Sequence, residues 1–296
     1  MAYDFDWVDA FTTTPFGGNA CVVVHGADDL AIDDRLALVR ETSLSECAYV
    51  VASDVADFGA RYYLADKEIL MAGHPTVATV VSLLDRELVP LVDGAASFTL
   101  EVGAGILPIE VTTTDAGPLV TMTQLAPEFG EVYDPGQIAL AYGLDATDVI
   151  GTPQIVSTGT PFCIVVLRDK DALRRAVLDV EAWQALNPPG TARAGLIEPF
   201  LVTLGGETDV GDTFSRLLLP PPMPSEDPFT GSATGCMAAY LWHHGLIKSP
   251  VFRAEQGHWI GRPGSAEVEV LGPRAAPTGV KVGGPGCVLM RGTLSI

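Results

Sequence analysis

The sequence predicts an α+β fold made of two similar halves, each rich in strands and each containing one buried helix. Short segments of alternating or β-branched residues recur along the whole chain. Only a few segments have the apolar period of a helix. Two of these helical segments begin at Gly73 and Gly231, follow a strand, and are apolar or small on most faces. They are the counterparts that a pseudo-repeated chain would contain.

Strand patterns account for most of the chain. The clearest hairpin joins Phe98–Val102 to Ile106–Val111 through a short glycine loop. Further strands are expected at residues 4–11, 20–25, 47–51, 61–64 and 119–123, and at 152–157, 162–167, 197–204, 213–219, 266–271 and 286–294.

Stretches rich in proline and glycine indicate where the halves divide. They cover residues 124–136, 187–195 and 220–224, and each is expected to be a linker or a long loop. The first stretch predicts the domain boundary. We therefore expect an N-terminal half-domain of residues 1–126, completed by the C-terminal strand 286–296, and a second half-domain of residues 127–285.

Three helices are expected. The first covers residues 32–41, where Ile32, Leu36 and Val39 recur at helical spacing. The helices that begin at Gly73 and Gly231 expose the free N–H groups of their first turns, which can bind an anion such as a carboxylate. The alternative is that both are simply central helices inside curved sheets, with glycine present for close packing.

Composition restricts the classes of function. The chain has 296 residues, which is about two domains' length, with 48% hydrophobic and 18% charged residues. A net charge of -20 would repel nucleic-acid phosphates and anionic lipid, so neither nucleic acid nor a membrane is expected as a partner. The acidic N-terminus does not resemble a secretory signal, and a cytoplasmic location is expected. Five scattered cysteines predict reduced, buried thiols.

Candidate chemistry is concentrated in three short segments. They contain Glu46, His74 and Asp227, each among small or apolar neighbours. Glu46 lies between a helix end and a strand, where partial burial can tune a carboxyl group for general acid/base catalysis. Taken singly, each residue has an ordinary alternative: a surface or capping acid, a buried histidine, or an acid that offsets a helix dipole.

Together, these segments belong to an ordered set of motifs. The set consists of D-A-F-T-x-x-P-F-G-G-N (9–19), L-S-E (44–46), A-G-H-P-T (72–76), L-E-V-G-A-G-I-L-P-I-E-V (100–111) and E-D-P-x-T-G-S-A-x-G (226–235), followed by E-Q-G-x-x-x-G-R-P (255–263). This order resembles the phenazine-biosynthesis PhzF-like family over nearly the whole chain.

The resemblance implies a fold similar to diaminopimelate epimerase. In that fold, two pseudo-symmetric domains each wrap a curved, mostly antiparallel sheet around a central helix, and the active site lies between them. It also implies a homodimer and catalysis without metal, flavin or nicotinamide. The residues implied as catalytic are Glu46 as the proton shuttle, with His74 and Asp227 orienting the substrate. We expect Gly73, Gly231, Ser232 and Asn19 to bind the substrate.

The resulting hypothesis is a cofactor-independent isomerase that moves a proton on a small dihydroaromatic or amino-acid-like carboxylate. An epimerase that uses two thiols is disfavoured, because Ala72 and Thr230 stand where those cysteines would be. The alternative from another class is a catalytically silent protein that binds a ligand or partner on the same fold. A metal- or nucleotide-dependent enzyme is disfavoured, since the chain lacks phosphate-binding glycine motifs and His243-His244 has no second ligand pair.

Overall fold

The computed structural model describes residues 2–188, 197–221 and 223–296. The chain divides into two compact units. Unit 1 consists of Met1–Thr123, Gly261–Ala266 and Val282–Ile296, and unit 2 consists of Gln124–Ile260 and Glu267–Lys281. Each unit therefore contains segments that are distant in sequence, and each is described below by itself.

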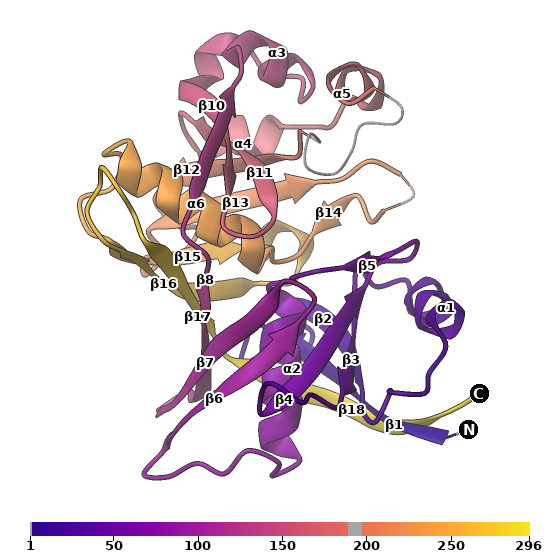
Figure 1. Ribbon diagram of the computed structural model, residues 1–296. Helices are drawn as coiled ribbons and strands as arrows, with labels where there is room; N and C mark the ends of the chain where they lie inside the picture. The colour runs from indigo at the N-terminus through magenta and orange to yellow at the C-terminus, as the bar shows by residue number, and fades with distance from the viewer. Residues whose placement is uncertain (1, 189–196, 222) are drawn as a thin grey trace. The chain divides into compact units, whose positions relative to one another are not determined.

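Unit 1 is a strand-rich unit around one central helix (Figure 1). Its elements are β1 (Ala2–Ala10), β2 (Asn19–Val24), α1 (Ile32–Thr42), β3 (Cys47–Val51), β4 (Phe58–Tyr63), β5 (Glu68–Ile69), α2 (His74–Asp85), β6 (Ala95–Val102), β7 (Gly105–Thr114), β8 (Gly117–Gln124) and β18 (Gly286–Ser295). β1 pairs antiparallel with both β2 and β18, whereas β2 and β3 are parallel. The predicted hairpin is confirmed as β6 and β7, which pair antiparallel with Val102 opposite Gly105.

Helix α2 is the centre of unit 1. It packs against β1, β2, β3 and β18. Every residue from His74 to Leu83 is buried. A helix that is apolar around its whole circumference requires neighbours on all sides, and the surrounding strands supply them. The start of α2 is consequently held inside the unit and is shielded from bulk water.

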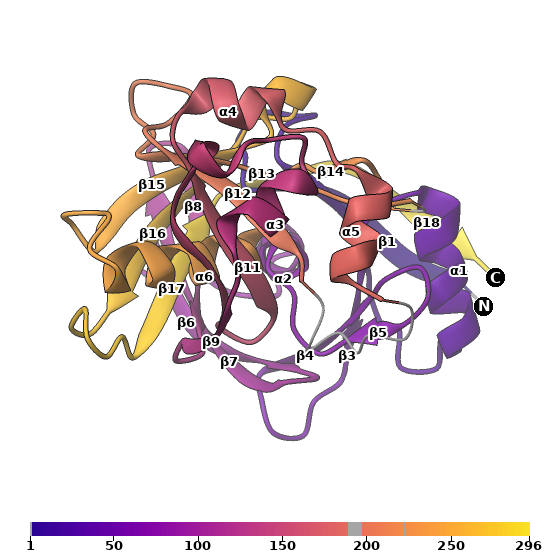
Figure 2. The same ribbon diagram turned by 90° about the horizontal axis from the view of Figure 1, so that it is seen from above.

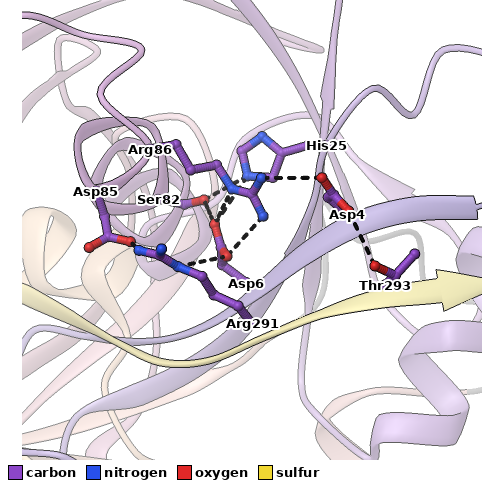
Figure 3. A network of polar contacts seen from close by, with 8 residues as sticks. All are labelled: Asp4, Asp6, His25, Ser82, Asp85, Arg86, Arg291 and Thr293. Carbon is purple, nitrogen blue, oxygen red and sulfur yellow. Dashed lines mark hydrogen bonds and ion pairs between the residues drawn. The ribbon is translucent and has the colours of Figure 1, made fainter.

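A buried carboxylate fixes the other end of α2 (Figure 3). Asp6 on β1 is fully buried and accepts hydrogen bonds from Ser82 Oγ at 2.6 Å and from Arg86 Nε at 2.6 Å. His25 Nε2 lies 2.7 Å from the same Ser82 hydroxyl, and Arg291 on β18 approaches Asp6 at 3.7 Å. Burial alone raises the pKa of Asp6, but the bonds from Arg86 and Ser82 outweigh it and hold the pKa below its usual value. The network ties α2 to both β1 and β18.

Unit 2 repeats the arrangement around a second central helix. Its elements are β9 (Glu128–Val132), α3 (Pro135–Leu140), a 3-10 turn at Ala146–Asp148, β10 (Val149–Ser157), β11 (Pro161–Leu167), α4 (Lys170–Arg175), α5 (Val180–Leu186), β12 (Pro199–Leu204), β13 (Thr213–Leu218), β14 (Glu226–Asp227), α6 (Gly231–His243), β15 (Val251–Gln256) and a 3-10 turn at His258–Ile260. Two further strands, β16 (Gly264–Leu271) and β17 (Gly279–Gly284), have residues in both units, as does β8, whose last residue, Gln124, belongs to unit 2.

Helix α6 packs against β10, β11 and β12. Figure 2 shows α6 beside β11. Gly231 through Leu241 are all buried. The strands beside it are mixed: β10 and β11 are antiparallel, whereas β11 and β12 are parallel. The prediction of one buried helix in each half is confirmed for both α2 and α6. No helix in the described part of the chain is long and apolar enough to cross a membrane.

Several elements differ from expectation. Residues 124–136, expected to be a linker or long loop, contain strand β9 and the start of α3. Strands β15 and β17 were not predicted, because charged residues or glycines interrupt their apolar alternation. The short helices α3, α4 and α5 were also missed; each is capped by an aspartate side chain, at Asp134, Asp169 and Asp179. Most of the predicted loop 187–195 lies outside the described residues.

Candidate active site

Glu46 lies at the entrance to β3. Helix α1 ends at Thr42, and the chain reverses at Ser43, which has a left-handed conformation with φ of 56°. Cys47 then begins β3, which runs parallel to β2 from the pair Val22 and Cys47 onward. This geometry places the Glu46 side chain at the edge of the unit 1 core, where it is 19% exposed. Its carboxyl group is largely removed from water but remains accessible.

The structure brings Glu46 together with two other predicted site residues. His74 is the first residue of α2, and Asn19 is the first residue of β2. The amide nitrogen of Asn19 lies 3.2 Å from His74 Nδ1, and Glu46 Oε2 lies 3.8 Å from His74 Nδ1. Gly73 precedes His74 at the N-cap of α2. Four of the seven predicted site residues therefore form one cluster in unit 1.

His74 is uncharged at neutral pH. Burial, assisted by the positive charge of Arg262, lowers the pKa of His74 from 6.5 to about 3. The 3.8 Å approach between Glu46 and His74 is therefore not an ion pair, and it exceeds hydrogen-bond distance. A neutral imidazole in this position can donate a hydrogen bond to a substrate without adding a charge to the site.

Two polar atoms in this cluster are buried without a hydrogen-bond partner among the described residues. They are His74 Nε2 and Ser45 Oγ. An unsatisfied buried polar group costs about 1–3 kcal/mol, and such groups are rare enough in folded proteins to require an explanation. A polar ligand at this cluster would satisfy them. Ser45 was not singled out from the sequence, although it lies within the L-S-E motif.

Arg262 holds the loop that precedes Asn19. Its guanidinium donates to Asp9 Oδ1 at 2.8 Å and to the carbonyl oxygens of Gly17 and Gly18, each at 2.8 Å. Asp9 is fully buried, and its other oxygen accepts the Phe16 N–H at 2.7 Å. Gly18 has a φ of +52°, and a Cβ there would lie 2.0 Å from the Ala10 carbonyl oxygen. The D-A-F-T-x-x-P-F-G-G-N and G-R-P motifs thus form one polar assembly.

Asp227 lies near the start of α6 in unit 2. It is 6% exposed, and its Oδ2 accepts a hydrogen bond from Thr230 Oγ1 at 2.5 Å. Gln256, at the end of β15, accepts from the Thr230 N–H at 3.0 Å and donates to the Asp227 carbonyl oxygen at 2.7 Å. Gln256 therefore holds the segment between Asp227 and the start of α6. The glutamine lies in the E-Q-G motif, but the sequence did not indicate this function.

Gly231 and Ser232 are the first two residues of α6, and both are buried. Gln124 donates to the Gly231 carbonyl oxygen at 3.0 Å and accepts from Thr158 Oγ1 at 2.6 Å. A Cβ at position 235 would lie 1.8 Å from Gln124 Oε1, so a side chain there would displace Gln124. The remaining three predicted site residues, Asp227, Gly231 and Ser232, therefore gather at one helix N-terminus in unit 2.

The five cysteines are free thiols. Cys47 lies beside Glu46 in sequence, yet it is fully buried, and this burial raises its pKa to about 12. Cys21, Cys163 and Cys236 are also buried, whereas Cys287 is half-buried, which corrects the expectation that all five would be buried. Within residues 2–188, 197–221 and 223–296, no group of three or more His, Cys, Asp or Glu side chains gathers in a way that could hold a metal ion.

Solved structures identify the fold. A PhzF-family phenazine biosynthesis protein from Bacillus anthracis matches all of this chain over its own full length, with a TM-score of 0.86 and 26% identity. A hydroxyproline epimerase from Agrobacterium vitis matches 99% of this chain and 92% of its own, with a TM-score of 0.67 at 14% identity, which shows the fold alone. The chain therefore has the α+β, diaminopimelate epimerase-like fold that the motifs implied, and it shares this fold with an epimerase.

Sequence comparisons then identify the family. Residues 8–292 match the PhzC-PhzF family of phenazine biosynthesis-like proteins, and the chain belongs to this family. An uncharacterized isomerase of Bacillus subtilis is 30% identical over 269 residues, which are 88% of each chain. The trans-2,3-dihydro-3-hydroxyanthranilate isomerase of Pseudomonas fluorescens is 29% identical over 97% of each chain. The protein is an isomerase of the PhzF family.

Proposed function

We propose that this isomerase shifts a proton, and with it a double bond, within a small carboxylate-bearing substrate of the dihydroaromatic or amino-acid-like type. The observation that carries the proposal is the position of Glu46: a partly exposed carboxyl group whose oxygen lies 3.8 Å from a neutral, buried histidine. A carboxyl group so placed can act as a general acid/base. The similarity to the Pseudomonas fluorescens enzyme supports a dihydroaromatic acid as the substrate.

In the proposed reaction, the Glu46 carboxylate removes a proton from one substrate carbon. The electrons of that C–H bond form a new double bond, and the existing double bond moves along the conjugated system. The protonated Glu46 then returns the proton to the carbon at the far end. The substrate is neither oxidised nor reduced. Glu46 is a carboxylate again once it has given up the proton. Because the Glu46 side chain is 19% exposed, the proton that it carries can exchange with solvent before it reaches the receiving carbon.

The other residues of the proposal bind and orient the substrate. His74 and Asp227 are proposed to orient its hydroxyl or amino group. Gly73, Gly231 and Ser232 are proposed to bind its carboxylate, because the N–H groups at a helix start favour an anion. Asn19 is included as a further residue of the binding site. All of these groups belong to the chain itself, and the proposed reaction uses no cofactor.

The test is proton exchange from solvent. trans-2,3-Dihydro-3-hydroxyanthranilate and related cyclic acids would be incubated with the enzyme in deuterated water and followed by NMR. We expect isomerisation with deuterium at the receiving carbon, and a fall of about 10²–10⁴-fold in Glu46→Gln, the usual range for loss of a general acid/base. Glu41→Gln is the matched control, because Glu41 is an exposed glutamate five residues earlier and should be dispensable.

Equal rates in the Glu46→Gln variant and the wild type would refute the assignment of Glu46. If every candidate acid bound to the protein but none was converted, the catalytically silent binding protein would be the better description.

A further inference from the structure

We propose that Asn19 selects the tautomer of His74, so that the ring carries its proton on Nε2 and presents this N–H to the substrate. The role in catalysis rests on the proposed function, whereas the tautomer itself does not. Asn19 is then a positioning residue that acts through His74.

The first step of the argument is the contact at Nδ1. The group of Asn19 that faces His74 Nδ1 is the amide nitrogen, at 3.2 Å. An amide NH₂ group only donates hydrogen bonds, so Nδ1 has to accept and cannot carry a proton. Glu46 Oε2, at 3.8 Å from Nδ1, is too distant to take a proton from it in a hydrogen bond. A neutral imidazole with a bare Nδ1 carries its one proton on Nε2.

The second step is the state of the other ring nitrogen. His74 is only 4% exposed, and its Nε2 is buried without a hydrogen-bond partner among the described residues. A buried N–H of this kind indicates a ligand that accepts a hydrogen bond. A hydroxyl, carbonyl or carboxylate oxygen of the substrate has the right chemistry. The tautomer with a bare Nε2 would instead repel such an oxygen.

The third step is that Asn19 is held in place from both sides. Its backbone begins β2, where Asn19 pairs with Ala10 of β1. The preceding residues, Gly17 and Gly18, are fixed by Arg262 through their carbonyl oxygens. Asn19 is 2% exposed, so its side chain has little room to reorient. The same guanidinium helps to keep His74 uncharged, and a neutral ring is needed for a tautomer to be selected at all.

The test is direct observation of the ring by ¹⁵N NMR. Protein labelled with ¹⁵N at its histidine rings would be measured near neutral pH, and His74→Gln would identify the His74 signals among those of the five histidines. In the wild type, we expect the protonated-type shift at Nε2 and the bare-type shift at Nδ1. In Asn19→Asp, the carboxylate accepts a proton from Nδ1, so the two shifts should exchange. In Asn19→Leu, which has no donor, the two shifts should move toward each other.

Two results would overturn the inference: a protonated Nδ1 in the wild type, or the wild-type pattern unchanged in both Asn19 variants. The spectra do not depend on turnover, so they remain decisive even if the proposed reaction fails. If the deuterium assay shows isomerisation, Asn19→Asp should lower kcat by about 100-fold while KM changes little. The reason is that His74 loses its Nε2 proton, which donates a hydrogen bond to the reacting substrate. An Asn19→Asp enzyme with switched ring shifts and unchanged kcat would overturn the catalytic role alone.

Discussion

The burial of His74 predicts a loss of stability in mild acid that a single substitution removes. The folded-state pKa of His74 is about 3, against about 6.5 for a histidine in an unfolded chain. Below about pH 6.5, the unfolded chain binds a proton at His74 that the folded protein does not bind, so acid favours unfolding. The loss grows by about 1.4 kcal/mol per pH unit between about pH 6.5 and pH 3. At about pH 5 it amounts to ~2 kcal/mol.

The assay is urea unfolding of the wild type and His74→Gln at about pH 7.5 and about pH 5. The lower pH stays above the isoelectric point of about 4.4, where the protein would tend to precipitate. Other titrating groups are common to both proteins and cancel in the comparison. We expect the wild type to lose ~2 kcal/mol more than the variant between the two conditions. His258→Gln, in unit 2, measures the effect of losing a histidine elsewhere.

Equal losses in the wild type and in His74→Gln would refute the reasoning, since they would show that His74 does not titrate differently in the folded and unfolded states. A lower stability of the variant at both pH values would not matter, because only the change between the two conditions is compared.

Three further predictions concern residues that support the site. Arg262→Met should lower the free energy of unfolding by about 3–5 kcal/mol, because it leaves the fully buried Asp9 carboxylate without its cation. Urea titration of this variant and of Arg262→Lys would show how much of the lost stability a retained positive charge restores. Gly18→Ala should be more destabilising than Gly26→Ala. Both glycines have a positive φ, but of the two only position 18 would place the new Cβ against a backbone oxygen. Equal midpoints of thermal unfolding for the two variants would contradict this prediction. Gly235→Ala should destabilise the protein by about 1–3 kcal/mol, because the new methyl group displaces Gln124. In a double-mutant cycle, Gly235→Ala should cost less when Gln124 is already alanine. Additive effects of the two substitutions would exclude the clash.

Local patterns predicted those parts of the fold that depend on neighbours in sequence. The β6–β7 hairpin was predicted correctly because its strands are adjacent and joined by a short glycine loop. The burial of α2 and α6 followed from their lack of a polar face. The motifs also predicted the family, because they record residue identity and order, and these are properties of the sequence itself.

Only the tertiary structure decided which side chains meet. Arg262 contacts Asp9 across 253 residues of sequence, and Asn19 contacts His74 across 55. No periodicity connects such pairs, since the position of each partner depends on how distant strands and helices pack. The same holds for the neutral state of His74, which arises from burial and from the charge of a residue far along the chain. Sequence alone therefore named Glu46, His74 and Asn19, while packing determined their distances and the charge of the imidazole ring.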